Sequence, residues 1–319
     1  MTMKIAVLDD YQGVAEKFAS WAALKQAHDV QIFREHIGGG QDAVVAALKD
    51  FDVIAAMRER TVFDRATLER LPNLKFMVTT GMRNSSIDIG YLKERGISCS
   101  GTAGRTQTTP ELAWGLILAV ARNIPFEDNN MRTGQWQQTI GLDLEDKTLG
   151  IVGLGRLGRE MARIGQAFKM NVIAWSENLT DASAAEVGVQ RAEKDALFAD
   201  ADVVTVHYKH SERSTGLLGA ADFAAMKPTG IFVNTSRAAI IDMAALIEAL
   251  QAGRIAGAGI DVYDDEPVPV NHPIRSCART VLTPHLGYVS HDTYRLFYTQ
   301  TVEDIEAWLT GAPVRVIDG

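Results

Sequence analysis

Gly153-Leu154-Gly155-Arg156-Leu157-Gly158 follows an apolar run at residues 149–152 and opens a helical pattern over residues 156–168. Three glycines at this spacing allow a tight turn, let a pyrophosphate approach the backbone and pack the helix closely on the strand. The unpaired amides at the start of the helix then bind the phosphate charge. The stretch therefore predicts a dinucleotide site that includes Gly153, Gly155, Arg156, Leu157 and Gly158. An ordinary glycine turn is the alternative.

The chain after this turn alternates between strands and helices. Residues 172–175 complete a βαβ unit, and residues 243–252 form a later helix in the pattern. Further strands are predicted at residues 203–207, 231–234, 257–261 and 280–282. Strands separated by helices form parallel sheets that are buried on both faces. The same alternation is seen earlier, with strands at residues 5–8, 53–56 and 76–79 and helices at 42–49 and 67–71.

Two helices mark where the chain passes between domains. A hydroxyl of Thr108 or Thr109 is expected to cap a helix at residues 112–121, with Pro110 in its first turn. An amphipathic helix at residues 292–309 has few partners nearby and is expected to return to the first domain. The sequence thus predicts an α/β fold with two Rossmann-like, doubly wound parallel-sheet domains, the first of them discontinuous.

Composition excludes several classes of protein. A length of 319 residues suits two domains better than one core. A net charge of -8 and a pI near 5.4, without a basic stripe, argue against nucleic acid or an anionic membrane as partner. The sequence has no membrane-length apolar run and no secretory signal at its start, so we expect a cytoplasmic protein. Cys99 and Cys277 lack metal-ligand spacing; we expect reduced thiols and no metal.

The end of the second strand of the βαβ unit bears on the choice of nucleotide. An acid about 20 residues after the glycine turn normally bonds the adenosine ribose. Here Ser176 stands at the strand end, and Glu177 follows it. A carboxylate at Glu177 would repel a 2′-phosphate, which favours NAD without excluding NADP. The alternative for Glu177 is a solvated loop residue, and Lys209 and His210 can add positive charge at the same end.

Three side chains that follow strands supply the groups needed to reduce a 2-oxo acid. Arg237 can hold a carboxylate through a bidentate fork. His285 can exchange the hydroxyl proton as acid and base. Glu266 can hydrogen-bond the imidazole and fix its tautomer. Taken singly, Arg237 is also typical of a surface ion pair and His285 of a structural histidine.

Several motifs of the chain together match one family. They are residues 153–158, 226–228, 234–237, 258–262, 266–267 and 283–285. Through them the chain resembles the D-isomer-specific 2-hydroxyacid dehydrogenases over nearly its whole length. The resemblance implies that Arg237, Glu266 and His285 are catalytic, that Asp261 lies close to the nicotinamide, and that the backbone of Thr235 helps to seat it.

The resemblance also carries expectations about domains and assembly. It implies a substrate domain at residues 1–100 and 290–319, and an NAD-binding domain at residues 101–289. Homodimers built mainly through the cofactor domain are expected as well. The partner molecule is expected to be a small 2-oxo or 2-hydroxy acid.

The loop at residues 79–88 resembles the family's substrate loop, whose backbone amides grip the substrate carboxylate. This assigns Gly81, Met82 and Arg83 to substrate binding. Arg83 stands near the place where the family usually has a second glycine, which suggests a substrate with a second anionic group or an extended polar tail. An exposed loop residue or a dimer contact is the alternative. Tyr288, where small residues are common, is expected to line the same site.

The leading function is stereospecific hydride transfer between NAD(H) and a D-2-hydroxy acid/2-oxo acid pair, with His285 as acid and base. A dinucleotide-sensing protein similar to NADH-dependent corepressors is a second class, since such proteins can retain the same residues. Oxidation of a small non-carbon oxyanion such as phosphite is a third, because Arg237 would hold any such anion. The sequence leaves the particular acid and the physiological direction open.

Overall fold

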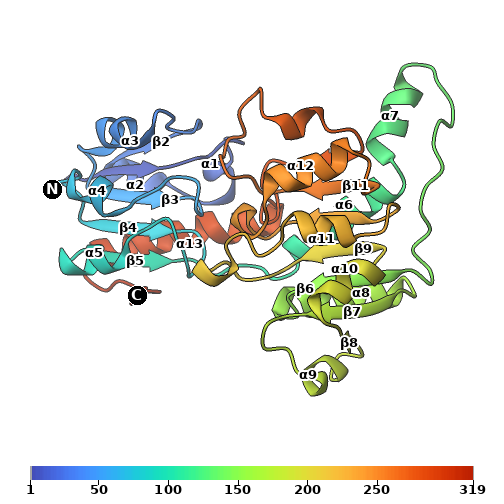
Figure 1. The fold of residues 1–319 in the computed structure, drawn as a ribbon. Coiled ribbons are helices and arrows are strands. Elements are labelled where there is room, and N and C mark those ends of the chain that lie inside the picture. Colours follow the sequence, from blue (N-terminus) through green and yellow to red (C-terminus); the bar gives the residue numbers. More distant parts are fainter. Residues whose placement is uncertain (1, 319) are drawn as a thin grey trace. The chain divides into compact units, whose positions relative to one another are not determined.

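The computed structural model describes residues 2–318 and divides the chain into two compact units. Unit 1 consists of Met1–Arg105 and Ser290–Gly319, and unit 2 of Thr106–Val289. Each unit contains one sheet of parallel strands with helices packed on it (Figure 1). The sequence predicted domain boundaries after residues 100 and 289. In the structure, the boundaries between the units lie after residues 105 and 289.

Unit 1 is built on five parallel strands. These are β1 (Lys4–Val7), β2 (Asp29–Ile32), β3 (Val53–Ala56), β4 (Phe76–Thr79) and β5 (Ser98–Gly101). Their order in the sheet is β2-β1-β3-β4-β5. Every residue of β3 and β4 is buried, because both faces of a parallel sheet are covered.

The helices of unit 1 pack on this sheet. They are α1 (Ala15–Phe18), α2 (Ala22–Ala27), α3 (Gly40–Leu48), α4 (Arg65–Glu69), α5 (Ile89–Glu94) and α13 (His291–Leu309). Asp64 and Asp88 cap α4 and α5 by accepting hydrogen bonds from backbone amides in the first turn. Helix α13 contacts α1, β4 and β5, so the segment after residue 290 completes the first unit.

Unit 2 contains a seven-stranded parallel sheet. Its strands are β6 (Thr148–Val152), β7 (Asn171–Trp175), β8 (Gln190–Arg191), β9 (Val203–Val206), β10 (Ile231–Asn234), β11 (Gly257–Ile260) and β12 (Thr280–Leu282). The order is β12-β11-β10-β9-β6-β7-β8. The strand order reverses between β6 and β9, and open α/β sheets bind ligands beyond the carboxyl ends of strands at such a point.

Two apolar cores fill the faces of this sheet. The helices are α6 (Thr108–Ala121), α7 (Ile124–Arg132), α8 (Arg156–Ala167), α9 (Asp181–Ala185), α10 (Lys194–Asp200), α11 (Ala220–Ala225) and α12 (Met243–Gln251), with short 3-10 turns η1 (Glu212–Ser214), η2 (Ala238–Ile240) and η3 (Pro273–Ser276). Trp114 of α6 and Met161 of α8 belong to one core, and Phe198 of α10 and Leu246 of α12 to the other. Within residues 2–318, no helix is both long and apolar enough to cross a membrane.

The predicted hydroxyl cap of the helix near residue 110 is wrong. Helix α6 begins at Thr108, and its N-cap residue Gln107 makes no side-chain capping bond. The hydroxyl of Thr109 instead donates to the carbonyl oxygen of Gly287 at 2.9 Å. A tertiary partner for the hydroxyl has therefore replaced the local one, and it ties the start of α6 to the loop that carries His285.

Candidate active site

The glycine turn after β6 leaves no room for side chains at two of its three glycines. Gly153 has a φ of +100°, and an added Cβ would lie 2.7 Å from the carbonyl oxygen of His207. A Cβ on Gly158 would overlap the carbonyl oxygen of Gly153. At Gly155, by contrast, an added Cβ would meet nothing within 4 Å. The turn thus holds α8 tightly against β6 and keeps open backbone at the helix start, which is the cradle that a pyrophosphate needs.

The start of α8 offers backbone donors. Gly155 is the N-cap and supplies no capping side chain, so the first amides of this 12-residue helix are not capped from that position. Gly155 and Arg156 are exposed, and Leu157 is half-buried. The predicted turn residues therefore lie together, at the positive end of a helix where an anion is stabilised.

The neighbouring strand ends form the edge where the sequence predicts adenosine. Ser176, directly after β7, accepts a hydrogen bond from the amide of Leu154 at 3.0 Å. Its hydroxyl thus braces the glycine turn. Glu177 is exposed. Trp175 and Tyr208 stack with ring centroids 5.9 Å apart, and this aromatic pair was not singled out from the sequence.

Arg237 is held by a turn that follows β10. The Asn234 side chain accepts from the amide of Ser236 at 3.0 Å and donates to the carbonyl of Arg237 at 3.1 Å. The Arg237 guanidinium donates to the carbonyl of Ser236 at 2.8 Å and is half-buried. Thr235, which lies between Asn234 and Ser236 in the chain, is buried. The turn fixes the backbone from which the guanidinium projects at the carboxyl edge of the sheet.

Asp261, directly after β11, organises the loop that bears His285. One carboxylate oxygen accepts from the Thr283 hydroxyl at 2.6 Å and from the Leu286 amide at 2.7 Å, and the other from the Gly287 amide at 2.9 Å. Burial raises the pKa of Asp261, although these bonds and the nearby His285 oppose the rise. Because both of its carboxylate oxygens bind the loop, Asp261 fixes the conformation of the loop that bears His285.

His285 and Glu266 form the hydrogen bond expected from the sequence. Nδ1 of the imidazole lies 2.7 Å from Oε2 of Glu266, and Oε1 of Glu266 accepts from the Tyr263 amide at 2.9 Å. His285 has a φ of +54°, and its ring meets the predicted site residue Tyr288 edge to face at 5.4 Å. Because Glu266 takes Nδ1, Nε2 is the nitrogen available to a substrate.

A second histidine at this edge is chemically different. His207 follows β9 and is buried, and burial lowers its pKa to about 3. Its Nε2 lies 2.8 Å from the Thr205 hydroxyl. His207 therefore stays neutral near pH 7, and of these two histidines His285 is the acid–base candidate.

The predicted substrate loop lies in unit 1, after β4. Gly81 has a φ of +91°, and its amide donates to the Thr102 hydroxyl at 2.9 Å. That amide is engaged, so the amides of Met82 and Arg83 are the remaining candidates for a carboxylate. Both residues are exposed.

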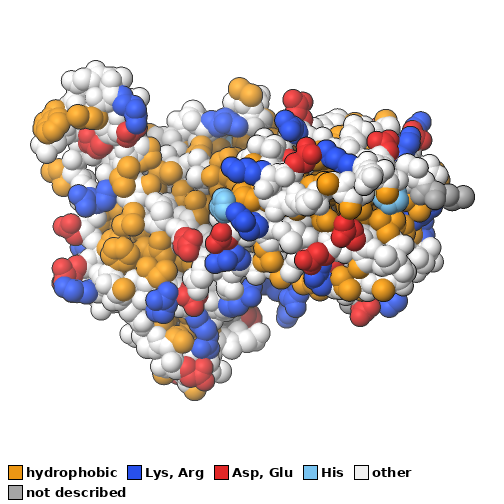
Figure 2. All heavy atoms as spheres, turned by 180° about the vertical axis from the view of Figure 1, so that it is seen from behind, with side chains coloured by type: hydrophobic (Ala, Val, Ile, Leu, Met, Phe, Trp, Pro, Cys, Tyr) orange, Lys and Arg blue, Asp and Glu red, His pale blue; other side chains and the backbone are white. Residues whose placement is uncertain are grey.

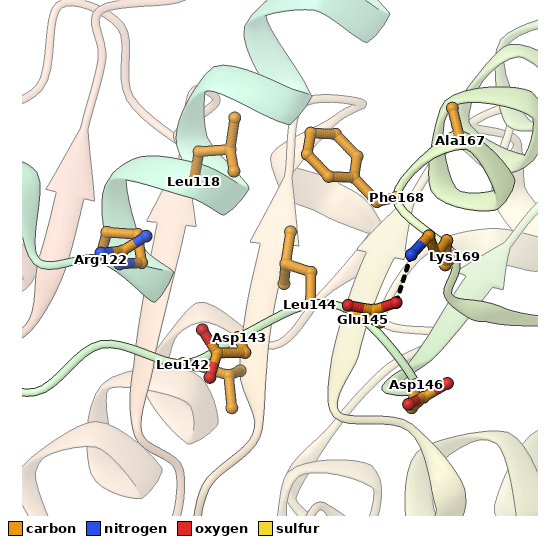
Figure 3. A pocket seen from close by; sticks show the side chains of 10 residues that line it. All are labelled: Leu118, Arg122, Leu142, Asp143, Leu144, Glu145, Asp146, Ala167, Phe168 and Lys169. Atoms are coloured by element: carbon orange, nitrogen blue, oxygen red, sulfur yellow. Dashed lines mark hydrogen bonds and ion pairs between the residues drawn. The ribbon is translucent and has the colours of Figure 1, made fainter.

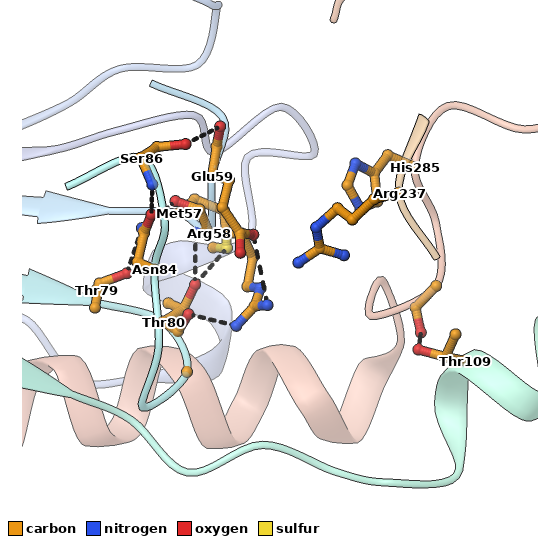
Figure 4. Close-up of polar contacts among 12 residues, drawn as sticks. Met57, Arg58, Glu59, Thr79, Thr80, Asn84, Ser86, Thr109, Arg237 and His285 are labelled. Carbon is orange, nitrogen blue, oxygen red and sulfur yellow. Dashed lines mark hydrogen bonds and ion pairs between the residues drawn. The ribbon is translucent and has the colours of Figure 1, made fainter. Parts of the chain in front are cut away.

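Arg58 is a neighbour of this loop that the sequence analysis did not single out. Its Nη1 donates to the Thr80 carbonyl at 3.0 Å, and its carbonyl accepts from Asn84 (Figure 4). An added Cβ on Gly81 would overlap this guanidinium. The available signal was an arginine shortly after an apolar strand, two residues after β3 for Arg58 and three residues after β10 for Arg237.

A cavity of about 570 Å³ opens elsewhere in unit 2 (Figure 3). It is lined by Leu118, Arg122, Leu142, Asp143, Leu144, Glu145, Asp146, Ala167, Phe168 and Lys169. The cavity meets the carboxyl end of α8, whereas the glycine turn opens that helix. Twelve helical residues span about 18 Å, so the cavity is separate from the dinucleotide site.

The fold and the glycine turn define unit 2 as a dinucleotide-binding α/β domain. The family model described as "D-isomer specific 2-hydroxyacid dehydrogenase, NAD binding domain" matches residues 114–287. Glyoxylate reductase from Thermococcus litoralis is 31% identical over 279 residues, covering 84% of this chain and 84% of its own length. The chain therefore belongs to the D-isomer-specific 2-hydroxyacid dehydrogenase family of oxidoreductases, and unit 2 is its NAD-binding domain.

Two further relatives extend the comparison. D-3-phosphoglycerate dehydrogenase from Archaeoglobus fulgidus is 34% identical over 281 residues, which cover 87% of this chain and 53% of that protein. The chain thus spans about half the length of that relative. The solved structure of phosphoglycerate oxidoreductase from Vibrio cholerae o395 matches with a TM-score of 0.91 at 34% identity, covering 98% of this chain and 100% of its own.

Proposed function

We propose that the protein is a dehydrogenase that transfers hydride between NAD(H) and a D-2-hydroxy acid/2-oxo acid pair, with His285 as acid and base. The observation that carries the proposal is the 2.7 Å hydrogen bond between His285 Nδ1 and Glu266 Oε2. A carboxylate on one ring nitrogen fixes the tautomer and orients the other nitrogen for proton transfer. Arg237, at the same edge of the sheet, supplies the fixed charge that an acid substrate requires.

Each residue has one task in the direction of reduction. When bound, NADH supplies the hydride that adds to C2 of the oxo acid. The imidazolium of His285 donates its Nε2 proton to the oxo oxygen, which becomes the hydroxyl. Glu266 stabilises the imidazolium and keeps Nδ1 protonated after transfer, so that Nε2 can take up the next proton from water. Arg237 holds the substrate carboxylate through two parallel hydrogen bonds.

The cofactor is held by the glycine turn and the first amides of α8. Ser176 supports the turn through its bond to the Leu154 amide, so recognition of the ribose falls to Glu177. We propose NAD over NADP because this carboxylate would repel a 2′-phosphate. Kd values for NADH and NADPH test this choice, and equal affinities would contradict it.

The substrate class is the next part of the proposal. Arg83 is exposed on the predicted substrate loop, and the name of the A. fulgidus relative specifies a substrate that carries a phosphate as well as a carboxylate. We propose that Arg83 selects 2-oxo acids with a second anionic group. The name glyoxylate reductase of the T. litoralis protein points to the alternative, a substrate without one.

A panel of 2-oxo acids tests function and substrate class together. Loss of NADH absorbance is followed with glyoxylate, hydroxypyruvate, phenylpyruvate and oxaloacetate, for the wild type and for Arg83→Ala. The variant is predicted to raise KM for oxaloacetate about tenfold and to leave KM for glyoxylate unchanged, as expected for loss of one ion pair. Equal changes in kcat/KM for mono- and dicarboxylic acids would contradict the role of Arg83.

The same panel separates the other functions. No turnover with any 2-oxo acid, together with tight NADH binding, would favour a dinucleotide sensor. Reduction of NAD by phosphite would favour the non-carbon substrate. The cytoplasmic location expected from the sequence stays a prediction.

We also propose a homodimer built through unit 2. Helix α7 and the segment after it carry large apolar side chains that are exposed in the single chain, and Figure 2 shows apolar side chains gathered on this part of unit 2. They are Ile124, Phe126, Met131, Trp136 and Ile140. Ile140 is 97% exposed and Trp136 is 68% exposed. Apolar surface of this extent is typical of a region that a second copy covers.

A further inference from the structure

The segment at residues 314–317 lies along the edge of the unit 1 sheet. Ser100 of β5 forms an antiparallel bridge with Val316. The amide of Gly101 donates to the carbonyl of Arg315 at 3.0 Å, and the amide of Ile317 donates to the carbonyl of Cys99 at 2.8 Å. The Ser100 hydroxyl adds a bond of 2.7 Å to the carbonyl of Val314. The segment therefore covers β5, which would otherwise end the sheet.

Arg315 fastens this segment to α13. Its guanidinium donates to Asp304 at 2.9 Å, to Glu303 at 2.9 Å and to the carbonyl of Gln300 at 3.1 Å. The Asp304 side chain is fully buried. A guanidinium held by two acidic side chains and a carbonyl is a rigid attachment, because its planar fork loses little freedom for each bond it makes.

Ile317 and the predicted substrate loop meet on the same side of Gly101. A Cβ added to Gly101 would lie 2.7 Å from the carbonyl oxygen of Gly81, 2.9 Å from Cδ1 of Ile317 and 3.1 Å from Cα of Met82. The loop is also tied to this strand end, because the amide of Gly81 donates to the hydroxyl of Thr102. Arg315, Ile317, Gly101 and the loop thus form one continuous series of contacts within unit 1.

We propose that Arg315 and Ile317 are positioning residues that fix the loop at residues 81–83 for the substrate carboxylate. The inference rests on the proposed function, which assigns this loop to substrate binding. Neither side chain touches substrate; Arg315 holds the segment in place, and Ile317 supports the strand end on which the loop rests. A loop that carries a binding site is held in place by its scaffold.

Two variants test the proposal at different points of the series. Arg315→Met detaches the segment from α13, and Ile317→Ala removes only the contact at Gly101. We expect each to raise KM for the 2-oxo acid about tenfold with kcat within about twofold, because a grip on the carboxylate contributes to ground and transition states alike. The Kd for NADH should not change, because the glycine turn belongs to unit 2. Amide hydrogen exchange at Met82 and Arg83 should become faster.

Arg65→Met is the matched control. It removes an arginine of unit 1 that pairs with Glu94 at 2.9 Å on the surface, and it has no contact with the segment or the loop in this structure. We expect this variant to keep the wild-type KM and exchange rates.

Folded variants of Arg315 and Ile317 with unchanged KM and unchanged exchange would overturn the proposal, even if their Tm were lower. If the wild type reduced no 2-oxo acid, the proposed function would fail, and exchange alone would decide whether the segment positions the loop.

Discussion

Single residues at the edge of the unit 2 sheet differ in what their hydrogen bonds leave available. Asp261 commits both carboxylate oxygens to the loop of His285, whereas Glu266 directs one oxygen to the imidazole itself. His207 is buried with a pKa near 3, while the side chain of His285 is 20% exposed. Residues of the same type thus differ in what their partners and burial leave available, and His285 keeps Nε2 open for the proton transfer proposed above.

Asp304 gives a residue-scale prediction about pH. Burial raises the pKa of Asp304 from 3.8 to about 7, with Glu303 adding to the rise and Arg315 opposing it. Between these two values the folded protein binds a proton that the unfolded chain has lost. The free energy of unfolding should therefore receive its full contribution from Asp304 below about pH 4 and lose up to about 4 kcal/mol as the pH rises to about 7.

Urea unfolding of the wild type and of Asp304→Asn between pH 4 and 9 measures this contribution. The variant should show a smaller loss of stability across the interval, and the two curves should run parallel above pH 8. Curves that are parallel over the whole range would mean that Asp304 is already ionised at pH 4.

The glycine turn and α8 form the element that the sequence defined best. The spacing of the three glycines predicted a tight turn and close packing of the helix on the strand, and the φ of +100° at Gly153 and the crowding at Gly158 agree with both. Strands β3, β4, β10 and β12 have the predicted bounds, because each is a short apolar run in a sheet.

Elements at the sheet edges were harder to predict. Strands β2, β5 and β8 were missed, and all three are edge strands of mixed or polar sequence, such as Ser98–Gly101. An edge strand needs fewer apolar residues than a central one, so the pattern carries less signal. The three catalytic residues could be proposed from the sequence because each follows an apolar strand in a familiar motif, and their catalytic role stays a prediction. The Trp175–Tyr208 stack and the hydrogen bond that the Leu154 amide donates to Ser176 could not be predicted from the sequence, since they join residues far apart in the chain.

Gly155→Ala is the element-scale prediction. A methyl group there meets no protein atom within 4 Å, so the fold should keep its stability. The methyl would occupy the space that a pyrophosphate approaches, and the affinity for NADH should fall at least about tenfold. Gly219→Ala, at another open glycine that starts a helix of unit 2, is the matched control. Wild-type NADH affinity in Gly155→Ala would place the cofactor elsewhere.

At the scale of the whole molecule, the residues proposed for cofactor and substrate binding are divided between the two units. Unit 2 holds the glycine turn, Arg237 and the His285–Glu266 pair, and unit 1 holds the loop proposed to grip the substrate carboxylate. Helix α13 belongs to unit 1 although it follows unit 2 in sequence. The expectation of a discontinuous first domain rested on that helix having few local partners.

The proposed homodimer yields a prediction at this scale. Ile140→Lys places a charge on the exposed apolar segment after α7 and should shift the protein from dimer to monomer, because burying an unpaired charge is costly. Size-exclusion chromatography with light scattering measures the mass. Val270→Lys, at a valine of unit 2 that is 93% exposed, is the control and should remain dimeric. A monomeric wild type, or a dimeric Ile140→Lys, would contradict the proposed interface.

The most direct test of the central claim compares the wild type with His285→Ala. NADH oxidation by the best 2-oxo acid of the panel gives kcat/KM, and NADH fluorescence gives the Kd. Loss of a general acid–base group should lower kcat/KM at least about a thousandfold, while the Kd for NADH changes less than about twofold. His291→Ala, at an exposed histidine of α13, should keep both values. Near-wild-type turnover by His285→Ala would show that another group moves the proton, and the assignment of the site would fail.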